Sequence, residues 1–146
     1  MEKIGLIAGN KKFPIIFSRA AKKKNQYIVA VAIKNDTSRS LKNIVDEIYW
    51  LSLSEFSKMF EIFKNKGITR IVMAGQISPR RLFSKEVQKD PVLKELLDSI
   101  KDKRADTIFG AIADKLKDAG FQLVNSTLFL EDYLPQRGIL TSKEPD

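Results

Sequence analysis

The sequence contains no cysteine and no histidine among its 146 residues. The absence of cysteine excludes disulfides, thiolate metal sites and cysteine nucleophiles, and the absence of histidine excludes a catalytic triad or general base built on imidazole. Seven glycines and five prolines are too few for a fibrous or linker-dominated chain. Any chemistry must therefore use carboxylates, lysine, hydroxyl groups, main-chain dipoles or a metal bound through oxygen.

Long hydrophobic runs are also missing. No segment approaches the roughly 18 consecutive apolar residues that span a bilayer. The apolar run near the amino terminus covers only residues 4–8, which is shorter than the roughly 7–15 apolar residues of a signal peptide. We therefore expect a cytoplasmic protein.

Charge of one sign is in excess, since 26 lysines and arginines face 18 aspartates and glutamates and give a formal charge of +8. Apolar residues at 43% and charged residues at 30% are typical of a globular protein, and the length fits one domain. The positive charge is compatible with nucleic acid, a membrane surface, an anionic metabolite or only a lysine-rich solvated exterior.

Apolar runs alternate with helical patterns along the chain. The spacing predicts strands over residues 4–8, 27–33, 44–51, 70–74 and 121–124. It predicts helices from Pro14 to Lys24, from Ser52 or Ser54 to Gly67, over 90–100 and over 106–119, and a loop over 34–43. The run 27–33 shows no polar alternation, which is typical of a strand covered on both faces. We therefore predict a Rossmann-like, three-layer α/β domain with a mostly parallel sheet of about five strands.

In such sheets, ligands bind at the carboxyl ends of the strands, which here selects residues 9–12, 34–36 and 75–80. Gly9 and Asn10 join the first strand to the first helix, whose amino-terminal N–H groups suit phosphate, and Lys11 and Lys12 add positive charge. The glycines at 5 and 9 do not form the dinucleotide fingerprint, and no P-loop is present. A plain strand-to-helix turn remains the alternative.

A second loop follows the fourth strand and contains Gly75, Gln76 and Arg80. Glycine permits close main-chain approach, glutamine can read a base or sugar, and arginine can clamp phosphate with a two-pronged fork. A solvated arginine pair is the alternative for residues 80–81. Asp106 and Thr107 either cap the helix that starts there or contact sugar hydroxyls or a metal-bound water.

Several segments together resemble a known family. They are GLIAGN at 5–10, FP at 13–14, VAIK at 31–34, AGQISPRRLF at 74–83, RADT at 104–107 and GILT at 138–141. In this order they resemble the N-terminal domain of the LpxI-type UDP-2,3-diacylglucosamine pyrophosphatases of lipid A biosynthesis. The match covers nearly the whole chain, and the combination is specific although each piece alone is weak.

The resemblance implies part of a two-domain enzyme. The family hydrolyses UDP-2,3-diacylglucosamine at the α-phosphorus to UMP and 2,3-diacylglucosamine 1-phosphate (lipid X), with a divalent metal such as Mg²⁺. The catalytic aspartate belongs to the family's C-terminal domain, which we expect to be absent here. Residues 1–140 would form the ligand-binding domain and 141–146 the start of the interdomain linker. No catalytic residue or metal ligand is expected in this chain, which would be inactive alone.

Binding positions carry over by resemblance to a defined set of residues. They are Gly9, Asn10, Lys11, Lys12, Gly75, Gln76, Asp106 and Thr107, with Lys34 and Arg80 as further positions. The family commonly has glycine where this chain has Lys11, which leaves the ligand's pose there open.

The expected partners are UDP-2,3-diacylglucosamine or lipid X and the family's C-terminal domain. The lipid substrate implies contact with the inner face of the bacterial inner membrane. No nucleic-acid partner is expected, and a homodimer is left open. The alternative function is a stand-alone nucleotide- or anion-binding or regulatory domain without catalytic activity. A weaker one is a non-specific nucleic-acid binder, suggested by the charge alone.

Overall fold

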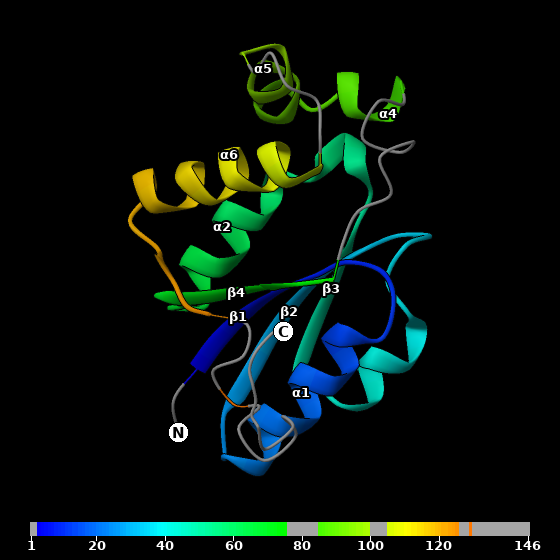
Figure 1. Cartoon of the computed structure of the whole chain (residues 1–146), viewed down its shortest axis with the longest axis vertical. Coiled ribbons are helices and arrows are strands. Elements are labelled where there is room, and N and C mark those ends of the chain that lie inside the picture. Colours follow the sequence, from blue (N-terminus) through cyan, green and yellow to red (C-terminus); the bar gives the residue numbers. More distant parts are fainter. Residues whose placement is uncertain (1–2, 76–84, 100–104, 126–128, 130–146) are drawn as a thin grey trace, which may run out of the picture.

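The computed structural model describes residues 3–75, 85–99, 105–125 and 129, with the main chain alone at 86 and 105–109. Its centre is one parallel sheet with the strand order β3-β2-β1-β4-β5 (Figure 1). The strands are β1 (Lys3–Ala8), β2 (Tyr27–Ile33), β3 (Glu47–Leu51), β4 (Arg70–Ala74) and β5 (Gln122–Leu123). The parallel five-stranded sheet confirms the predicted α/β fold class.

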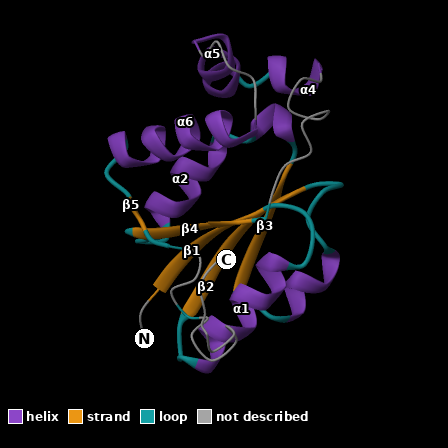
Figure 2. Cartoon of the chain, viewed as in Figure 1, coloured by secondary structure: helices purple, strands orange, loops and turns teal. Residues whose placement is uncertain are grey.

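Helices cover both faces of this sheet (Figure 2). The α-helices are α1 (Phe13–Lys23), α2 (Lys58–Asn65), α4 (Lys85–Gln88), α5 (Pro91–Ser99) and α6 (Ala105–Asp118), and the 3₁₀ helices are η1 (Arg39–Asn43) and η2 (Leu53–Glu55). Helices α1 and η1 lie on one face, α2 and α6 lie on the other, and α4 and α5 lie beyond them (Figure 1). The three layers follow the expectation from sequence.

The core divides into two clusters, one on each face of the sheet. On β1, Leu6 packs with Phe17 in the cluster under α1, while Ile7 packs with Phe63 in the cluster under α2. This division follows from the alternation of side chains along a strand. On β2, residues 28–33 are all buried, as a strand covered on both faces requires.

Some element boundaries differ from the sequence prediction. The expected loop over 34–43 contains η1, because Leu41 is buried in the cluster under α1. Strand β3 begins at Glu47, later than the predicted residue 44. The helix expected after Ser52 is divided into η2 and α2. Strand β5 is shorter than the predicted 121–124.

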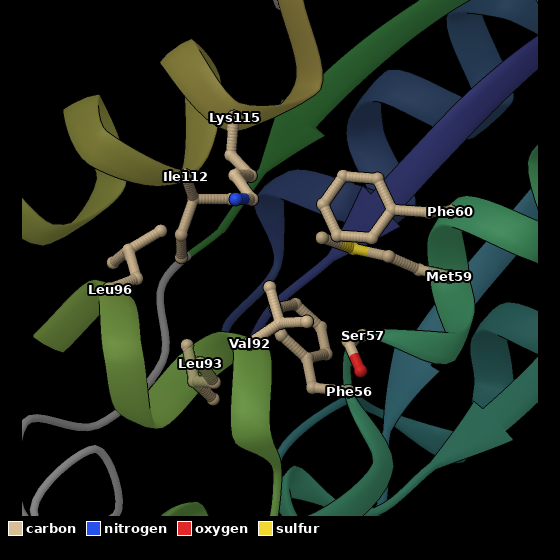
Figure 3. Close-up of a pocket in the computed structure, with 9 residues that line it drawn as sticks. All are labelled: Phe56, Ser57, Met59, Phe60, Val92, Leu93, Leu96, Ile112 and Lys115. Atoms are coloured by element: carbon tan, nitrogen blue, oxygen red, sulfur yellow. The ribbon is translucent and has the colours of Figure 1, made fainter. Parts of the chain in front are cut away.

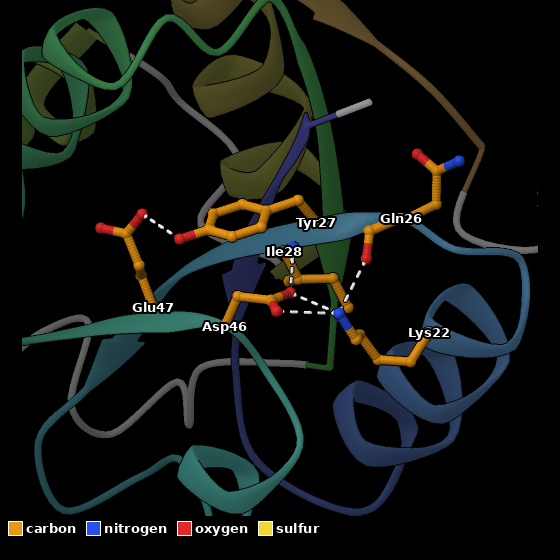
Figure 4. Close-up of polar contacts among 6 residues, drawn as sticks. All are labelled: Lys22, Gln26, Tyr27, Ile28, Asp46 and Glu47. Atoms are coloured by element: carbon orange, nitrogen blue, oxygen red, sulfur yellow. Dashed lines mark hydrogen bonds and ion pairs between the residues drawn. The ribbon is translucent and has the colours of Figure 1, made fainter. Parts of the chain in front are cut away.

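Polar side chains tie the elements together at the amino edge of the sheet (Figure 4). Lys22 on α1 pairs with Asp46 at 2.7 Å between Nζ and Oδ2. The same carboxylate oxygen accepts a hydrogen bond from the Ile28 N–H at 2.8 Å. Between the same two strands, the Tyr27 hydroxyl donates to Glu47 Oε2 at 2.8 Å. These carboxylates therefore join α1, β2 and β3 at the edge opposite to the predicted ligand site.

Within the described ranges, no helix combines the length and the hydrophobicity needed to cross a membrane.

Candidate anion-binding site

The strand order places a topological switch point between β1 and β4. The chain moves outward from β1 to β3 on one side, then returns to form β4 on the other. Open parallel sheets bind ligands in the crevice at the carboxyl side of such a point. The Gly9 N–H donates to the Ala74 carbonyl oxygen at 2.8 Å. The two loops singled out from the sequence therefore leave the sheet side by side.

Gly75, where the second loop begins, lies against the first loop. Its φ angle is +83°, and a Cβ atom there would lie 2.6 Å from the Asn10 carbonyl oxygen and 3.0 Å from Pro14 Cγ. Glycine alone accepts both the left-handed conformation and this contact. The main chain of the first loop therefore occupies the space that a side chain at position 75 would need.

Lys11 and Lys12 are exposed at the start of α1. Lys12 is the N-cap residue, and its carbonyl oxygen accepts hydrogen bonds from the N–H groups of Ile15 and Ile16, both at 3.0 Å. Lys11 has a φ angle of +68°, which costs an L-residue about 1–2 kcal/mol. The resemblance leads us to expect glycine at position 11. The left-handed conformation gives the physical reason, because glycine adopts it without this cost.

The main-chain N–H groups of residues 10–13 make no hydrogen bond within the part of the chain that the structure describes. They lie in succession between the end of β1 and the first turn of α1. Consecutive N–H groups at a helix amino terminus form a concave site for anions. Two lysine side chains next to them add full positive charges.

Asn10 contributes an unusual acceptor to the same turn. Its side-chain oxygen Oδ1 is buried and has no hydrogen-bond partner among the described residues. Leaving a buried acceptor unpaired costs about 1–3 kcal/mol. A ligand hydroxyl that donates to this oxygen would recover that cost.

Thr37 joins this turn to the neighbouring strand and was missed by sequence reasoning. Its buried hydroxyl donates to the Ala8 carbonyl oxygen at 2.7 Å and accepts from the Ile33 N–H at 2.9 Å. The carboxyl ends of β1 and β2 are thereby fixed together. A single threonine in a polar loop carries no sequence signal for this role.

Lys34 follows β2 and borders a separate hollow of about 600 Å³. Its main-chain N–H donates to the Leu51 carbonyl oxygen at 2.9 Å, and its Nζ lies 4.0 Å from Glu55 Oε1. Hydrogen bonds from Lys58 and from the Ser52 N–H lower the pKa of the Glu55 carboxyl. The hollow is also lined by Asn35, which belongs to the predicted segment 34–36, and by residues that sequence reasoning did not select, namely Thr37, Arg39, Lys42 and Trp50.

The structure describes the remaining predicted positions only in part or not at all. Asp106 and Thr107 lie in the first turn of α6, which begins one residue earlier than expected, and only their main chain is described. The predicted positions Gln76 and Arg80 lie outside the described residues, as does the expected linker at 141–146.

An apolar pocket lies among α2, α5 and α6 (Figure 3). It is lined by Phe56, Ser57, Met59, Phe60, Val92, Leu93, Leu96, Ile112 and Lys115. Its volume of about 10 Å³ is at the lower limit for one water molecule. This pocket is therefore a packed seam of the core and offers no space for a ligand as it stands.

The carboxylates do not form a metal site within the described ranges. No three acidic side chains gather there in a group that could hold a metal ion. Mg²⁺ prefers carboxylate, carbonyl and water oxygens, so the described residues do not fit the divalent metal implied by the resemblance.

Comparison with known proteins adds a family match. The LpxI N-terminal domain profile matches residues 3–133. No curated protein matches the chain. Among solved structures, the chain is similar to a multifunctional pyruvate carboxylase from Rhizobium etli, with 16% identity and a TM-score of 0.49 over 84% of this chain and 10% of that one. It is also similar to leucoanthocyanidin reductase from Vitis vinifera in its binary complex with NADPH, with 10% identity and a TM-score of 0.47 over 84% of this chain and 48% of that one. The chain thus spans a tenth and about half of the length of these two proteins.

Proposed function

The chain belongs to the LpxI N-terminal domain family, and we propose that it is the substrate-binding domain of a UDP-2,3-diacylglucosamine pyrophosphatase. The observation that carries this proposal is that the carboxyl ends of β1 and β4 meet at the switch point, with the Gly9 N–H bonded to the Ala74 carbonyl oxygen at 2.8 Å. A site formed by the turn after β1, with two lysines and N–H groups that have no partner among the described residues, suits the diphosphate of a sugar nucleotide.

In this proposal, the diphosphate lies across the amino terminus of α1. The N–H groups of residues 10–13 donate to phosphate oxygens, and Lys11 and Lys12 neutralise their charge. Hydrogen bonds to charged phosphate oxygens are stronger than those between neutral groups. Asn10 Oδ1, which has no partner among the described residues, accepts a hydrogen bond from a sugar hydroxyl. These contacts bind and orient the substrate and cleave no bond.

Hydrolysis is assigned to groups outside this site. Attack of water on the α-phosphorus releases UMP and lipid X and needs stabilisation of the developing charge, which metal ions commonly supply. Since the described residues form no carboxylate cluster, we place the catalytic aspartate and the metal ligands on the family's C-terminal domain. The lipid chains of the substrate would bring the complex to the cytoplasmic face of the inner membrane.

Calorimetry with UDP and with lipid X tests the binding role. Replacing Lys12 by alanine should weaken UDP binding by about tenfold at low salt, because one charge-assisted phosphate contact is lost. Lys64→Ala removes the same charge from the exposed surface of α2 and should leave the affinity within about twofold. Equal affinities of wild type and Lys12→Ala would refute the proposed site.

The same geometry also fits a nucleotide-binding or regulatory domain without enzymatic activity. An assay of UDP-2,3-diacylglucosamine hydrolysis separates the two functions. The chain alone should show no turnover above background in either case, and measurable turnover would contradict both. Turnover that appears on adding the catalytic domain of a family member, and that decreases with Lys12→Ala, would favour the pyrophosphatase.

A further inference from the structure

A second part of the carboxyl edge has the features of a ligand site. The hollow of about 600 Å³ is lined by Lys34, Asn35, Thr37, Arg39, Lys42 and Trp50, and we call it the Trp50 hollow. Its residues come from the end of β2, the segment that contains η1, and the edge strand β3. Its volume is within the range of pockets that hold small molecules.

Among the described residues, the lining carries positive charge and no carboxylate, since three of the six are lysine or arginine. Arg39 and Lys42 are exposed, and neither forms an ion pair within the described part of the chain. Such a group of cations around one hollow attracts an anion. Arginine in particular can donate two parallel hydrogen bonds to two oxygens of one phosphate.

Trp50 adds an aromatic surface to these charges. Ile48 on β3 packs into the cluster under α1, and Trp50 projects to the same face of the sheet because side chains alternate along a strand. Trp50 is half-buried and belongs to neither core cluster of the described residues. Its ring therefore borders the hollow outside the two core clusters of the described residues. An aromatic ring beside cations can stack a nucleobase whose phosphates the cations hold.

The Trp50 hollow lies next to the switch-point site, with Thr37 between them. This residue lines the hollow, and its hydroxyl donates to the Ala8 carbonyl oxygen at 2.7 Å, directly before Gly9. The two places are therefore neighbours at the carboxyl edge of the sheet.

We infer that the Trp50 hollow binds the nucleoside end of the nucleotide, with the base on Trp50 and with Arg39 and Lys42 beside its phosphates. The inference rests on the proposed function, because the diphosphate would run from the hollow to the amino terminus of α1. The ligand class is a nucleoside diphosphate or its sugar ester, and the hollow selects for the base as well as for the charge.

Fluorescence provides a direct test, because Trp50 is the only tryptophan of the chain. Titration of the full chain with UDP should change the Trp50 emission in a saturable way. Inorganic pyrophosphate carries the anion without the base and should bind about tenfold more weakly, since stacking of one base contributes about 1–3 kcal/mol.

Variants measured by calorimetry separate the base from the phosphates. Trp50→Ala should weaken UDP binding by about tenfold while Trp50→Phe, which keeps an aromatic face, should lose only about threefold. The affinity of Trp50→Ala for pyrophosphate should not change. Arg39→Gln/Lys42→Gln should weaken UDP binding by about tenfold at low salt. Lys64→Gln/Lys117→Gln removes two charges from α2 and α6 and should stay within about twofold of wild type. Thermal melting of each variant shows that it is folded.

The outcomes distinguish this inference from the proposed function. If Lys12→Ala weakens UDP binding and the hollow variants do not, the switch-point site stands and the inference is wrong. Equal affinity for UDP and pyrophosphate would also overturn it, because the hollow would then bind anions without reading a base. If UDP does not bind at all, both the inference and the proposed function fail.

Discussion

At the scale of single residues, two glycines with similar backbone angles differ in what surrounds them. Gly67 has a φ angle of +71° and nothing within 4 Å of an added Cβ, whereas an added Cβ at Gly75, with φ +83°, meets the Asn10 carbonyl oxygen at 2.6 Å. Gly67→Ala should therefore lower the free energy of unfolding by about 1 kcal/mol from backbone strain alone. Gly75→Ala should lower it by about 2–4 kcal/mol, because overpacking adds to the strain.

Urea unfolding of the two variants measures this difference. Gly67→Ala serves as the matched control for the left-handed angle. An equal loss in both variants would mean that the second loop can move away from Asn10, and that the two loops are not held together by Gly75.

Lys11 presents the opposite case, an L-residue in a conformation that favours glycine. With its φ of +68°, replacement by glycine should raise the free energy of unfolding by about 0.5–1 kcal/mol, since relief of strain exceeds the extra entropy of the unfolded chain. Lys11→Ala keeps the strain and should stay within a few tenths of a kcal/mol of wild type. If urea unfolding shows that Lys11→Ala is more stable than Lys11→Gly, the backbone at position 11 is not strained and the prediction is wrong.

At the scale of elements, Asp90 begins two helices at once. This carboxylate is fully buried. Its Oδ1 accepts from the N–H groups of Val92 at 3.1 Å and Leu93 at 3.0 Å in α5, and its Oδ2 accepts from the Ser57 N–H at 2.6 Å, directly before α2. The sequence predicted a helix beginning at Asp90 and Pro91, and α5 confirms it. The second bond, to a residue far along the chain, appears only in the fold.

Replacing Asp90 by alanine removes both caps. Each cap contributes about 0.5–2 kcal/mol, so the free energy of unfolding should decrease by about 1–4 kcal/mol in total. Asp90→Asn keeps one acceptor oxygen and should lose about half as much. The control is Asp98→Ala, also on α5 but exposed and paired with Lys94 in a surface ion pair at 3.4 Å, which should cost less than about 0.5 kcal/mol. Denaturant unfolding in which Asp90→Ala and Asp98→Ala lose equal stability would contradict the double cap.

At the scale of the whole molecule, Glu47 connects three parts of the fold at the amino edge of the sheet. Its Oε1 lies 2.9 Å from Lys66 Nζ and accepts from the Tyr49 hydroxyl at 2.8 Å. Its Oε2 accepts from the Tyr27 hydroxyl at 2.8 Å. These hydrogen bonds lower the pKa of Glu47 from 4.5 to about 2, and the hydrogen bond with Lys66 has the largest effect. In turn, hydrogen bonds with Tyr49 and Glu47 raise the pKa of Lys66.

A lowered pKa in the folded state makes stability depend on pH in one direction. The contribution of Glu47 is fully present above its unfolded pKa near 4.5 and is lost as the pH decreases toward about 2. In unfolding experiments over this range, the wild type should lose stability more steeply than Glu47→Gln. Glu61→Gln, at an exposed position on α2, should keep the wild-type slope. Parallel curves for wild type and Glu47→Gln would rule out this linkage.

The elements of the fold were predictable where the local pattern was strong. The apolar runs of β1, β2 and β4 identified these strands because buried strands need no polar alternation. The 3₁₀ helix η1 was missed because Leu41 is buried only after α1 packs over it. Trp50 was missed as a site residue because a lone aromatic in a mixed strand normally belongs to a core. Its place outside both clusters depends on β3 being at the edge of the sheet.

By itself, the sequence determined the α/β class, the parallel sheet, and the glycines and lysines that follow its strands, because these depend on periodicity and turn chemistry within short segments. Only the tertiary structure decided the strand order, and with it the neighbours of each loop. It brought the Gly9 N–H to the Ala74 carbonyl oxygen, Thr37 to Ala8, and Trp50 to a hollow that Lys34, Arg39 and Lys42 also line. The missing histidine and cysteine excluded several chemistries from the sequence alone. The strand order could not be predicted in this way, because pairing between neighbouring strands depends on contacts between distant residues, which no local pattern encodes.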